Sequence, residues 1–260
     1  MSFLSEIQTE KKVLPRRILV YGTHGIGKST FGSMAPNPVF IQTEEGLDDI
    51  ECHKFPLAET YSEVTDAVGA LAQEKHDYKT LVIDSADWLE RLIWNEVCKQ
   101  QGKNSIEDIG YGKGYVFAVD IWRELLEGLN ILRKERDMFI VLIAHAQIEK
   151  FQNPETDAYD RYSPRLHKHA SAVIQEWCDE VLFASYKVLT KQTDAGFGKK
   201  VAQGISDGER YIRTTERPAH VAKNRLNMAD EIPLNWNSYA EYLPQNSQPT
   251  ETKKGDEKTW

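Results

Sequence analysis

The chain has 260 residues and a formal net charge of −8, with 28% charged and 40% hydrophobic residues, which is typical of a folded globular protein rather than a disordered one. Its apolar runs are far shorter than the ~20 residues of a membrane span, and its first residues lack the apolar core of a signal peptide. The negative charge excludes a protein that binds nucleic acid through bulk charge alone. Three widely spaced cysteines, Cys52, Cys98 and Cys178, form neither a disulfide framework nor a CxxC metal motif, which favours the reducing cytoplasm.

Apolar runs and helical periods alternate along the first two thirds of the chain. The apolar runs contain few polar residues, which is typical of strands that are buried on both faces. The sequence therefore predicts an α/β domain with a mostly parallel sheet covered by helices. Strands are expected at 17–21, 38–43, 80–84 and 138–144, a short helix after the first of them, and longer helices at 61–74, 87–99 and 116–135.

The pattern changes after His145. Residues 147–169 are polar and contain two prolines, so we expect a long loop there. Next come a helix at 170–177 and two strands, at 180–189 and 210–215, that form an antiparallel edge pair joined by the glycine-containing connection 194–208. The end of the chain has almost no apolar residues, which predicts a disordered tail. The expected organisation is an N-terminal extension at 1–15, one domain at 16–243 and a tail at 244–260.

A phosphate-binding motif follows the first predicted strand. The segment Gly22-Thr-His-Gly-Ile-Gly-Lys28-Ser29 matches G-x-x-x-x-G-K-[ST] in full and precedes a predicted helix, which is the context of a P-loop. Lys28 is expected to face the β- and γ-phosphates of ATP, and the Ser29 hydroxyl to bind Mg²⁺. The expected nucleotide-binding residues of this segment are Gly22, Thr23, His24, Gly25, Ile26, Gly27, Lys28, Ser29 and Thr30.

Asp84 ends the third apolar strand. Ligands of an open α/β sheet bind at the carboxyl ends of its strands, where P-loop enzymes use an aspartate to hold the metal. Asp84 is therefore the second expected residue at the Mg²⁺ ion. The alternative is that Asp84 or Ser85 simply caps the following helix.

The end of the second strand resembles RecA-type recombinases. In Phe40-Ile-Gln-Thr-Glu44-Glu45-Gly-Leu47-Asp48, Glu44 takes the place of the glutamate that activates the attacking water, and Asp48 the place of the residue that contacts adenine. A carboxylate beside the γ-phosphate can accept a proton from water. Glu45 is the competing base, because a shift of one residue changes the side that a strand residue faces.

His145 ends the fourth strand, where RecA-like proteins carry a glutamine that senses the γ-phosphate. With His145, Gly110-Tyr-Gly-Lys-Gly114 and Ala222-Lys-Asn-Arg225, residues 16–243 resemble the phage-encoded Sak-type single-strand annealing ATPases. This resemblance implies a RecA-like fold, ATP hydrolysis, and a ring or filament with ATP at subunit interfaces. It also implies the host cytoplasm, with a single-strand-binding protein as a further candidate partner. The alternative for His145 is a structural core histidine.

The resemblance places single-stranded DNA on segments 100–115 and 146–170. Both carry cations among aromatic residues, which suits binding to a single strand without sequence preference. Acidic residues precede the cations of the second segment, so an ordinary solvated loop is the alternative. The candidate DNA-binding residues are Lys103, Lys113, Arg161, Arg165 and Lys168.

Lys223, Arg225 and Arg217 are the candidates for a cation that acts on the ATP of a neighbouring subunit, because such a charge stabilises the transferring phosphoryl group. The alternative is that they cover the sheet edge as solvated charges. The favoured function is an ATP-dependent protein that binds and anneals single-stranded DNA in phage recombination. Two other functions stay open: a P-loop phosphotransferase with segment 146–170 as its substrate lid, and a nucleotide-switched assembly protein with negligible turnover.

Overall fold

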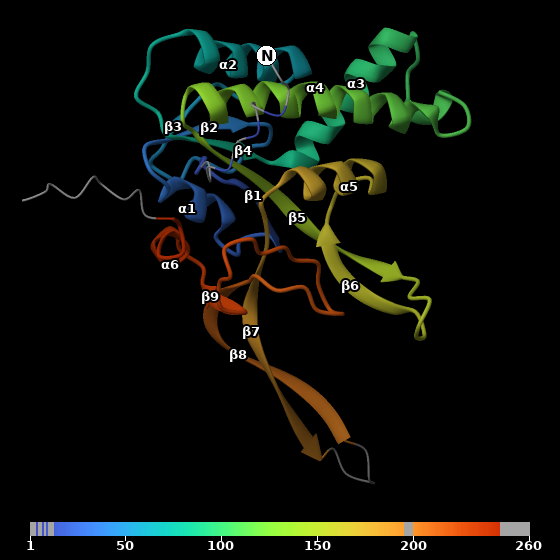
Figure 1. The fold of residues 1–260 in the computed structure, drawn as a ribbon. Coiled ribbons are helices and arrows are strands. Elements are labelled where there is room, and N and C mark those ends of the chain that lie inside the picture. Colours follow the sequence, from blue (N-terminus) through green and yellow to red (C-terminus); the bar gives the residue numbers. More distant parts are fainter. Residues whose placement is uncertain (1–3, 5–6, 8, 10–12, 195–199, 245–260) are drawn as a thin grey trace, which may run out of the picture.

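The computed structural model describes residues 4, 7, 9, 13–194 and 200–244. Within them, one nine-stranded sheet has the order β3-β2-β4-β5-β1-β7-β8-β9, and β6 pairs with β5 outside this path (Figure 1). The strands are β1 (Arg17–Gly22), β2 (Pro38–Gln42), β3 (His53–Lys54), β4 (Thr80–Asp84), β5 (Phe139–Phe151), β6 (Tyr159–Pro164), β7 (Glu180–Asp194), β8 (Lys200–Arg213) and β9 (Glu231–Pro233).

The strands from β3 to β7 in this order are parallel, whereas β8 and β9 add antiparallel partners beside β7. The predicted fold class, a mostly parallel sheet with an antiparallel edge, is confirmed. Strand β1 lies between β5 and β7, and Gly22 is level with both His145 and Ala184. The carboxyl ends of β1, β4 and β5 therefore meet at one edge of the sheet, where ligands of such folds bind.

Helices cover both faces of the sheet, which explains the continuous apolar strands. In β1, Leu19 and Tyr21 pack against the larger helical layer, whereas Ile18 and Val20 face the opposite side. The larger layer holds α2 to α5, and the other face holds α1 and α6 (Figure 1). The helices are α1 (Lys28–Ser33), α2 (Tyr61–Gln73), α3 (Ala86–Gln101), α4 (Lys113–Glu135), α5 (Lys168–Trp177) and α6 (Trp236–Ala240), with a 3-10 helix, η2, at Ile106–Asp108.

The loop expected at 147–169 is wrong over most of its length. Strand β5 continues to Phe151 and forms an antiparallel hairpin with β6, in which Phe151 is opposite Tyr159. Only the end of β6 next to the core is buried, at Ser163 and Pro164, and Ile148 is 64% exposed. Because most of the hairpin is not buried, no hydrophobic alternation marks its strands in the sequence, and the pairing of the two strands determines their structure.

The connection expected at 194–208 is wrong over most of its length, because β8 begins at Lys200, and β7 runs to Asp194, beyond the expected strand end at 189. The β7–β8 pair extends well beyond the rest of the sheet (Figure 1). Strands β3 and β9 and helix α6 were not predicted, since two to five residues are too few for a recognisable period. Most of the expected extension at 1–15 and all but one residue of the expected tail lie outside the described residues.

No helix in the described part of the chain has the length and apolar character required to cross a bilayer.

Candidate nucleotide-binding site

The P-loop lies between β1 and α1, and glycines shape both of its ends. A Cβ at Gly22 would lie 2.4 Å from the carbonyl oxygen of Ala184 in β7, so only glycine lets the two strands approach this closely. Gly27 precedes α1 with a φ of 105°, in the left-handed region that favours glycine. The turn brings the chain directly into a helix N-terminus, where backbone N–H groups bind phosphate.

Lys28 is buried in the first turn of α1. Its Nζ donates hydrogen bonds to the carbonyl oxygens of Gly22 at 3.2 Å and Thr23 at 3.0 Å. Burial lowers the pKa of Lys28, while the carboxylates of Asp84 and Glu44 oppose this shift. A desolvated ammonium close to the P-loop amides is suited to bind a polyphosphate, because charge interactions are stronger where water is excluded.

Asp84 lies beside Ser29, as the sequence predicts for a magnesium site. The Ser29 hydroxyl donates to Asp84 Oδ2 at 2.6 Å, and burial raises the pKa of Asp84 while this hydrogen bond lowers it. Ser85, not Asp84, is the N-cap of α3. The described residues contain no cluster of three or more His, Cys, Asp or Glu side chains for a metal. Two oxygen ligands fit Mg²⁺, which commonly takes its other ligands from phosphates and water.

A cavity of about 330 Å³ opens above these residues. Gly22, Thr23 and Ile26 of the predicted set do not line it, and Ile26 is buried in the core. Asp48, expected at the adenine, also lies outside the lining and pairs with Lys54 at 3.1 Å. The cavity is lined by His24, Gly25, Gly27, Lys28, Ser29, Thr30, Glu44, Glu45, Gly46, Leu47, Ile50, Asp84, His145 and Arg210.

Glu44 is held at the end of β2 by contacts of the preceding residue. Thr43 accepts a hydrogen bond from the Ser85 N–H at 3.0 Å and donates its hydroxyl to the Ser85 carbonyl at 2.8 Å. Burial raises the pKa of Glu44, although His145 opposes this shift, and a carboxylate of raised pKa is a suitable proton acceptor. Glu45 also lines the cavity but is exposed, so Glu44 is the more buried of the two candidate bases.

His145 is buried at the edge of the cavity and is part of a charged network. Its Nδ1 lies 3.1 Å from Asp87 Oδ2 and 3.7 Å from Glu44 Oε1, and its backbone N–H donates to Asp87 at 3.0 Å. The ring of His24 lies over the His145 ring, with centroids 4.0 Å apart. Because His145 faces the phosphate cavity as well as Asp87, it is more than a core histidine satisfied by backbone.

Asp87 was missed by sequence reasoning. It lies in the first turn of α3 and also accepts a hydrogen bond from Arg165 Nε at 3.0 Å. Burial alone would raise the pKa of Asp87, but hydrogen bonds from His145 and Arg165 hold it well below its usual range. An aspartate at the start of a helix is an ordinary signal, so nothing in the sequence distinguishes Asp87 as the link between His145 and Arg165.

The five candidate DNA-binding cations fall into two groups. Arg165 pairs with Asp87, and Arg161 pairs with Glu149 at 2.9 Å while its guanidinium lies over the Phe151 ring. Each of these two arginines therefore has an acidic partner within the chain, so neither is the unpaired solvated cation of the alternative interpretation. Lys103, Lys113 and Lys168 are exposed, and within the described residues no ion pair involves them.

The two segments expected to contact DNA meet in the structure. Tyr115, at the start of α4, stacks on His167, just before α5, with ring centroids 4.0 Å apart and planes 9° from parallel. Lys113 and Lys168 are the first residues of these helices, so the stack brings both lysines to one surface. Tyr111, in the same segment as Lys113, is fully exposed.

Beneath this surface, Glu90 of α3 is 3% exposed and accepts a hydrogen bond from the His167 N–H at 2.9 Å. Its other carboxylate oxygen has no partner in the described part of the chain. Burial raises the pKa of Glu90 from 4.5 to about 7. The native state therefore binds more protons than the unfolded state between these values, so the stability contributed by this group falls as the pH rises through that range.

The variant Glu90→Gln removes the buried charge and keeps an oxygen acceptor for His167. We expect it to unfold like the wild type near pH 5 and to be about 1–3 kcal/mol more stable than the wild type at pH 8. Urea unfolding at both pH values measures the difference. Glu135→Gln, on an exposed residue of α4, is the control and should show no such pH dependence; an equal effect of both variants would contradict the prediction.

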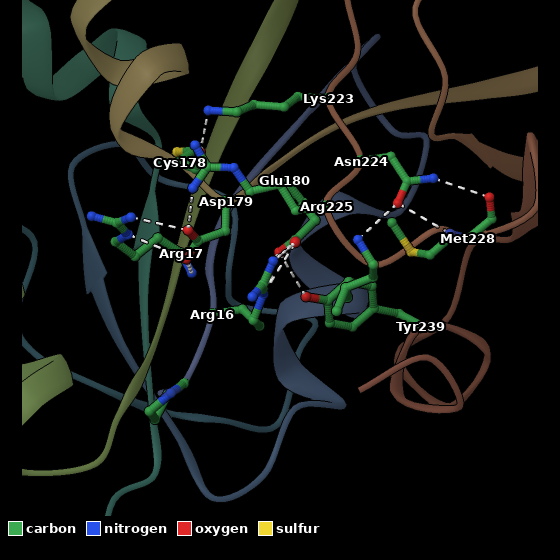
Figure 2. A network of polar contacts seen from close by, with 12 residues as sticks. Arg16, Arg17, Cys178, Asp179, Glu180, Lys223, Asn224, Arg225, Met228 and Tyr239 are labelled. Carbon is green, nitrogen blue, oxygen red and sulfur yellow. Dashed lines mark hydrogen bonds and ion pairs between the residues drawn. The ribbon is translucent and has the colours of Figure 1, made fainter. Parts of the chain in front are cut away.

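Two of the three candidates for a cation acting in trans, Lys223 and Arg225, lie near the start of β7 (Figure 2), whereas Gly22 of the P-loop is level with Ala184, farther along this strand. Lys223 Nζ donates to the carbonyl oxygens of residues 175, 176 and 178 at 2.6–2.9 Å, which stabilises the C-terminus of α5. Arg225 pairs with Asp179 at 3.1 Å, yet its side chain is 53% exposed. Arg217, 58% exposed, pairs with Asp230.

Asp179 and Glu180 anchor this region. Asp179 also pairs with Arg17 at 3.0 Å and with Arg133 at 3.3 Å. Glu180 is fully buried and accepts hydrogen bonds from Arg16 Nε at 3.1 Å and the Tyr239 hydroxyl at 3.1 Å. Buried carboxylates require such partners, so these contacts of Asp179 and Glu180 stabilise the start of β7 within its own chain.

Comparison with known proteins found similar proteins and a matching family. The SPbeta prophage-derived uncharacterized protein YorG of Bacillus subtilis (strain 168) is 20% identical over 223 residues, which are 82% of this chain and 60% of that protein. The chain thus spans well under two thirds of the length of this relative. The crystal structure of the RadB recombinase shares 12% identity and a TM-score of 0.43 over 77% of this chain and 80% of that one. A family model described as AAA domain matches residues 14–226, and the chain belongs to this family of P-loop ATPases.

Proposed function

We propose that the protein is a RecA-like ATPase that binds single-stranded DNA and promotes annealing in phage DNA metabolism. The observation that carries the proposal is the direct connection, through Asp87, between His145 in the phosphate cavity and Arg165 at the base of the exposed hairpin. Through this connection, a ligand that moves Arg165 at the hairpin would also move His145 beside the expected γ-phosphate.

In the proposed reaction, each residue of the cavity has a role in ATP hydrolysis. The P-loop amides and Lys28 bind the phosphates of ATP, and Ser29 and Asp84 hold Mg²⁺, which would neutralise charge on the phosphate oxygens. Glu44 orients a water molecule toward the γ-phosphorus and accepts its proton as the new P–O bond forms and ADP leaves. His145, fixed by Asp87, is placed to detect whether the γ-phosphate is present.

The surface around the Tyr115–His167 stack supports the choice of single-stranded DNA. Lys113 and Lys168 supply charge for phosphates, and the fully exposed Tyr111 offers a ring on which a base can stack. Arg161 and Arg165 contribute less to this surface, because both are already paired with carboxylates.

Assembly in a ring or filament is part of the proposal. Arg217 and Arg225 keep half or more of their side-chain surface exposed and are the preferred cations to act on the ATP of a neighbouring subunit. Lys223 is the weaker candidate, since three carbonyl oxygens of its own chain already hold its ammonium.

The test is the rate of ATP hydrolysis with and without single-stranded DNA, combined with a triple variant in which Lys103, Lys113 and Lys168 become alanine. We expect DNA to stimulate the wild type. In the variant, DNA affinity should fall similarly for all base sequences, and the slope of log affinity against log salt should flatten by about two units, at about 0.7 per lost phosphate contact. ATP binding without DNA should persist.

The matched control replaces Lys75, Lys79 and Lys134, three exposed lysines away from this surface, and should bind DNA like the wild type. Equal DNA affinity and salt slope in both triple variants would show that DNA does not bind at this surface. If DNA also failed to change the rate of hydrolysis, a phosphotransferase with the hairpin as its lid would be the better interpretation.

A further inference from the structure

Arg210 is a cation in the nucleotide cavity that no sequence motif indicates. It belongs to β8, opposite Tyr186 of β7, and so comes from the antiparallel pair rather than from the parallel strands that supply the P-loop, Glu44 and Asp84. Its backbone carbonyl accepts a hydrogen bond from the Leu234 N–H at 3.0 Å. The pairing and this contact fix the backbone from which its side chain reaches the cavity.

The guanidinium of Arg210 lies over the last turn of the P-loop. A Cβ placed on Gly27 would be 3.1 Å from Arg210 Nη1, so the guanidinium is next to the backbone that precedes Lys28. In P-loops this backbone binds the α- and β-phosphates, whereas the lysine reaches the β- and γ-phosphates. Arg210 therefore lies on the side of the expected α- and β-phosphates.

The surroundings of Arg210 leave its charge available. Its neighbours Arg213 and Arg217 pair with Glu231 and Asp230, but no ion pair in the described part of the chain involves Arg210. Its guanidinium lies over the Tyr186 ring at 6.0 Å, a contact that orients the side chain without neutralising it. Because Arg210 and the buried Lys28 are both cations, a polyanion between them would be attracted to both. A planar guanidinium also binds phosphate oxygens through two parallel hydrogen bonds.

We propose that Arg210 binds the α- and β-phosphates of the nucleotide within the same subunit. This inference rests on the proposed nucleotide site and adds a ligand contact to it. It also gives the β7–β8 pair, which projects from the sheet (Figure 1), a direct contact with bound nucleotide.

The test is equilibrium binding of ATP and ADP to the purified 260-residue chain, measured by titration calorimetry. Arg210→Gln removes the charge and keeps a polar side chain. We expect it to lower the affinity for ATP and for ADP about 10-fold or more, and by the same factor, since both nucleotides carry the α- and β-phosphates. Arg210→Lys should be intermediate, because it keeps the charge but loses the planar fork. Arg213→Gln, on the same strand but outside the cavity, is the control and should bind like the wild type.

Unchanged ATP and ADP affinity in Arg210→Gln, with tight binding by the wild type, would overturn the inference and leave the proposed function intact. A loss confined to ATP would also overturn it, since it would place the guanidinium at the γ-phosphate. A wild type that binds neither nucleotide would overturn the nucleotide site itself. Circular dichroism of each variant establishes that it is folded.

Discussion

A Lys28→Ala protein is expected to fold like the wild type and to lose ATP hydrolysis by a factor of at least about 100. The buried ammonium of Lys28 lies within the P-loop and donates to the carbonyl oxygens of Gly22 and Thr23. Its removal leaves the charge on the β- and γ-phosphates without this partner in the transition state. The measurement is the steady-state rate of phosphate release by the purified protein.

Folding must be measured alongside the rate. Both hydrogen bonds of the Lys28 ammonium stay within the P-loop, and the cost of its burial offsets its attraction to Asp84 and Glu44. We therefore expect the free energy of unfolding of the variant to differ from that of the wild type by less than about 1 kcal/mol. Lys99→Ala, on a lysine of α3 that is 81% exposed, is the control for removing a positive charge. Normal hydrolysis by a folded Lys28→Ala protein would contradict the P-loop assignment.

The second large effect is expected from Glu44→Gln. The amide can still hydrogen-bond a water molecule but cannot accept its proton, so turnover should fall by about 10²- to 10⁴-fold. ATP binding should be retained, because Glu44 lies outside the P-loop, whose backbone amides and lysine are expected to bind the phosphates. Single-turnover hydrolysis and nucleotide binding, measured on the same preparation, separate the chemical step from affinity.

Glu45→Gln is the matched comparison, since Glu45 is the next residue and also lines the cavity but is exposed. It should hydrolyse ATP within a few-fold of the wild type. The opposite result, with turnover lost in Glu45→Gln and kept in Glu44→Gln, would show that the register of the resemblance is wrong by one residue and that burial near His145 does not identify the base.

The Asp87 network has a consequence for experiments on DNA binding. Replacement of Arg165 removes a partner of Asp87 and a neighbour of His145 in addition to any contact with DNA. A loss of DNA-dependent hydrolysis in an Arg165 variant therefore has two physical explanations. Lys103, Lys113 and Lys168 lack such partners among the described residues and give a cleaner test.

Local sequence was sufficient to predict the P-loop and the strand ends beside it. The P-loop, its strand and helix, and Asp84 at a strand end were predicted because each depends on a few consecutive residues: glycines that permit the turn, and apolar runs that end in a polar side chain. Parallel strands place their carboxyl ends at one edge, so Lys28, Glu44, Asp84 and His145 were expected together and do line one cavity.

Tertiary structure decided the features that depend on partners far apart in the chain. The β5–β6 hairpin is buried only at its end next to the core, so the pairing of its strands, not a hydrophobic pattern, identifies it. Asp87 and Arg165 are 78 residues apart, and Arg210 reaches Gly27 from an antiparallel strand that the sequence ties to no ligand. A charged side chain carries no sequence signal for the group it will meet, because ion pairs and phosphate contacts depend on distance in space, which only packing of the sheet and its edge strands determines.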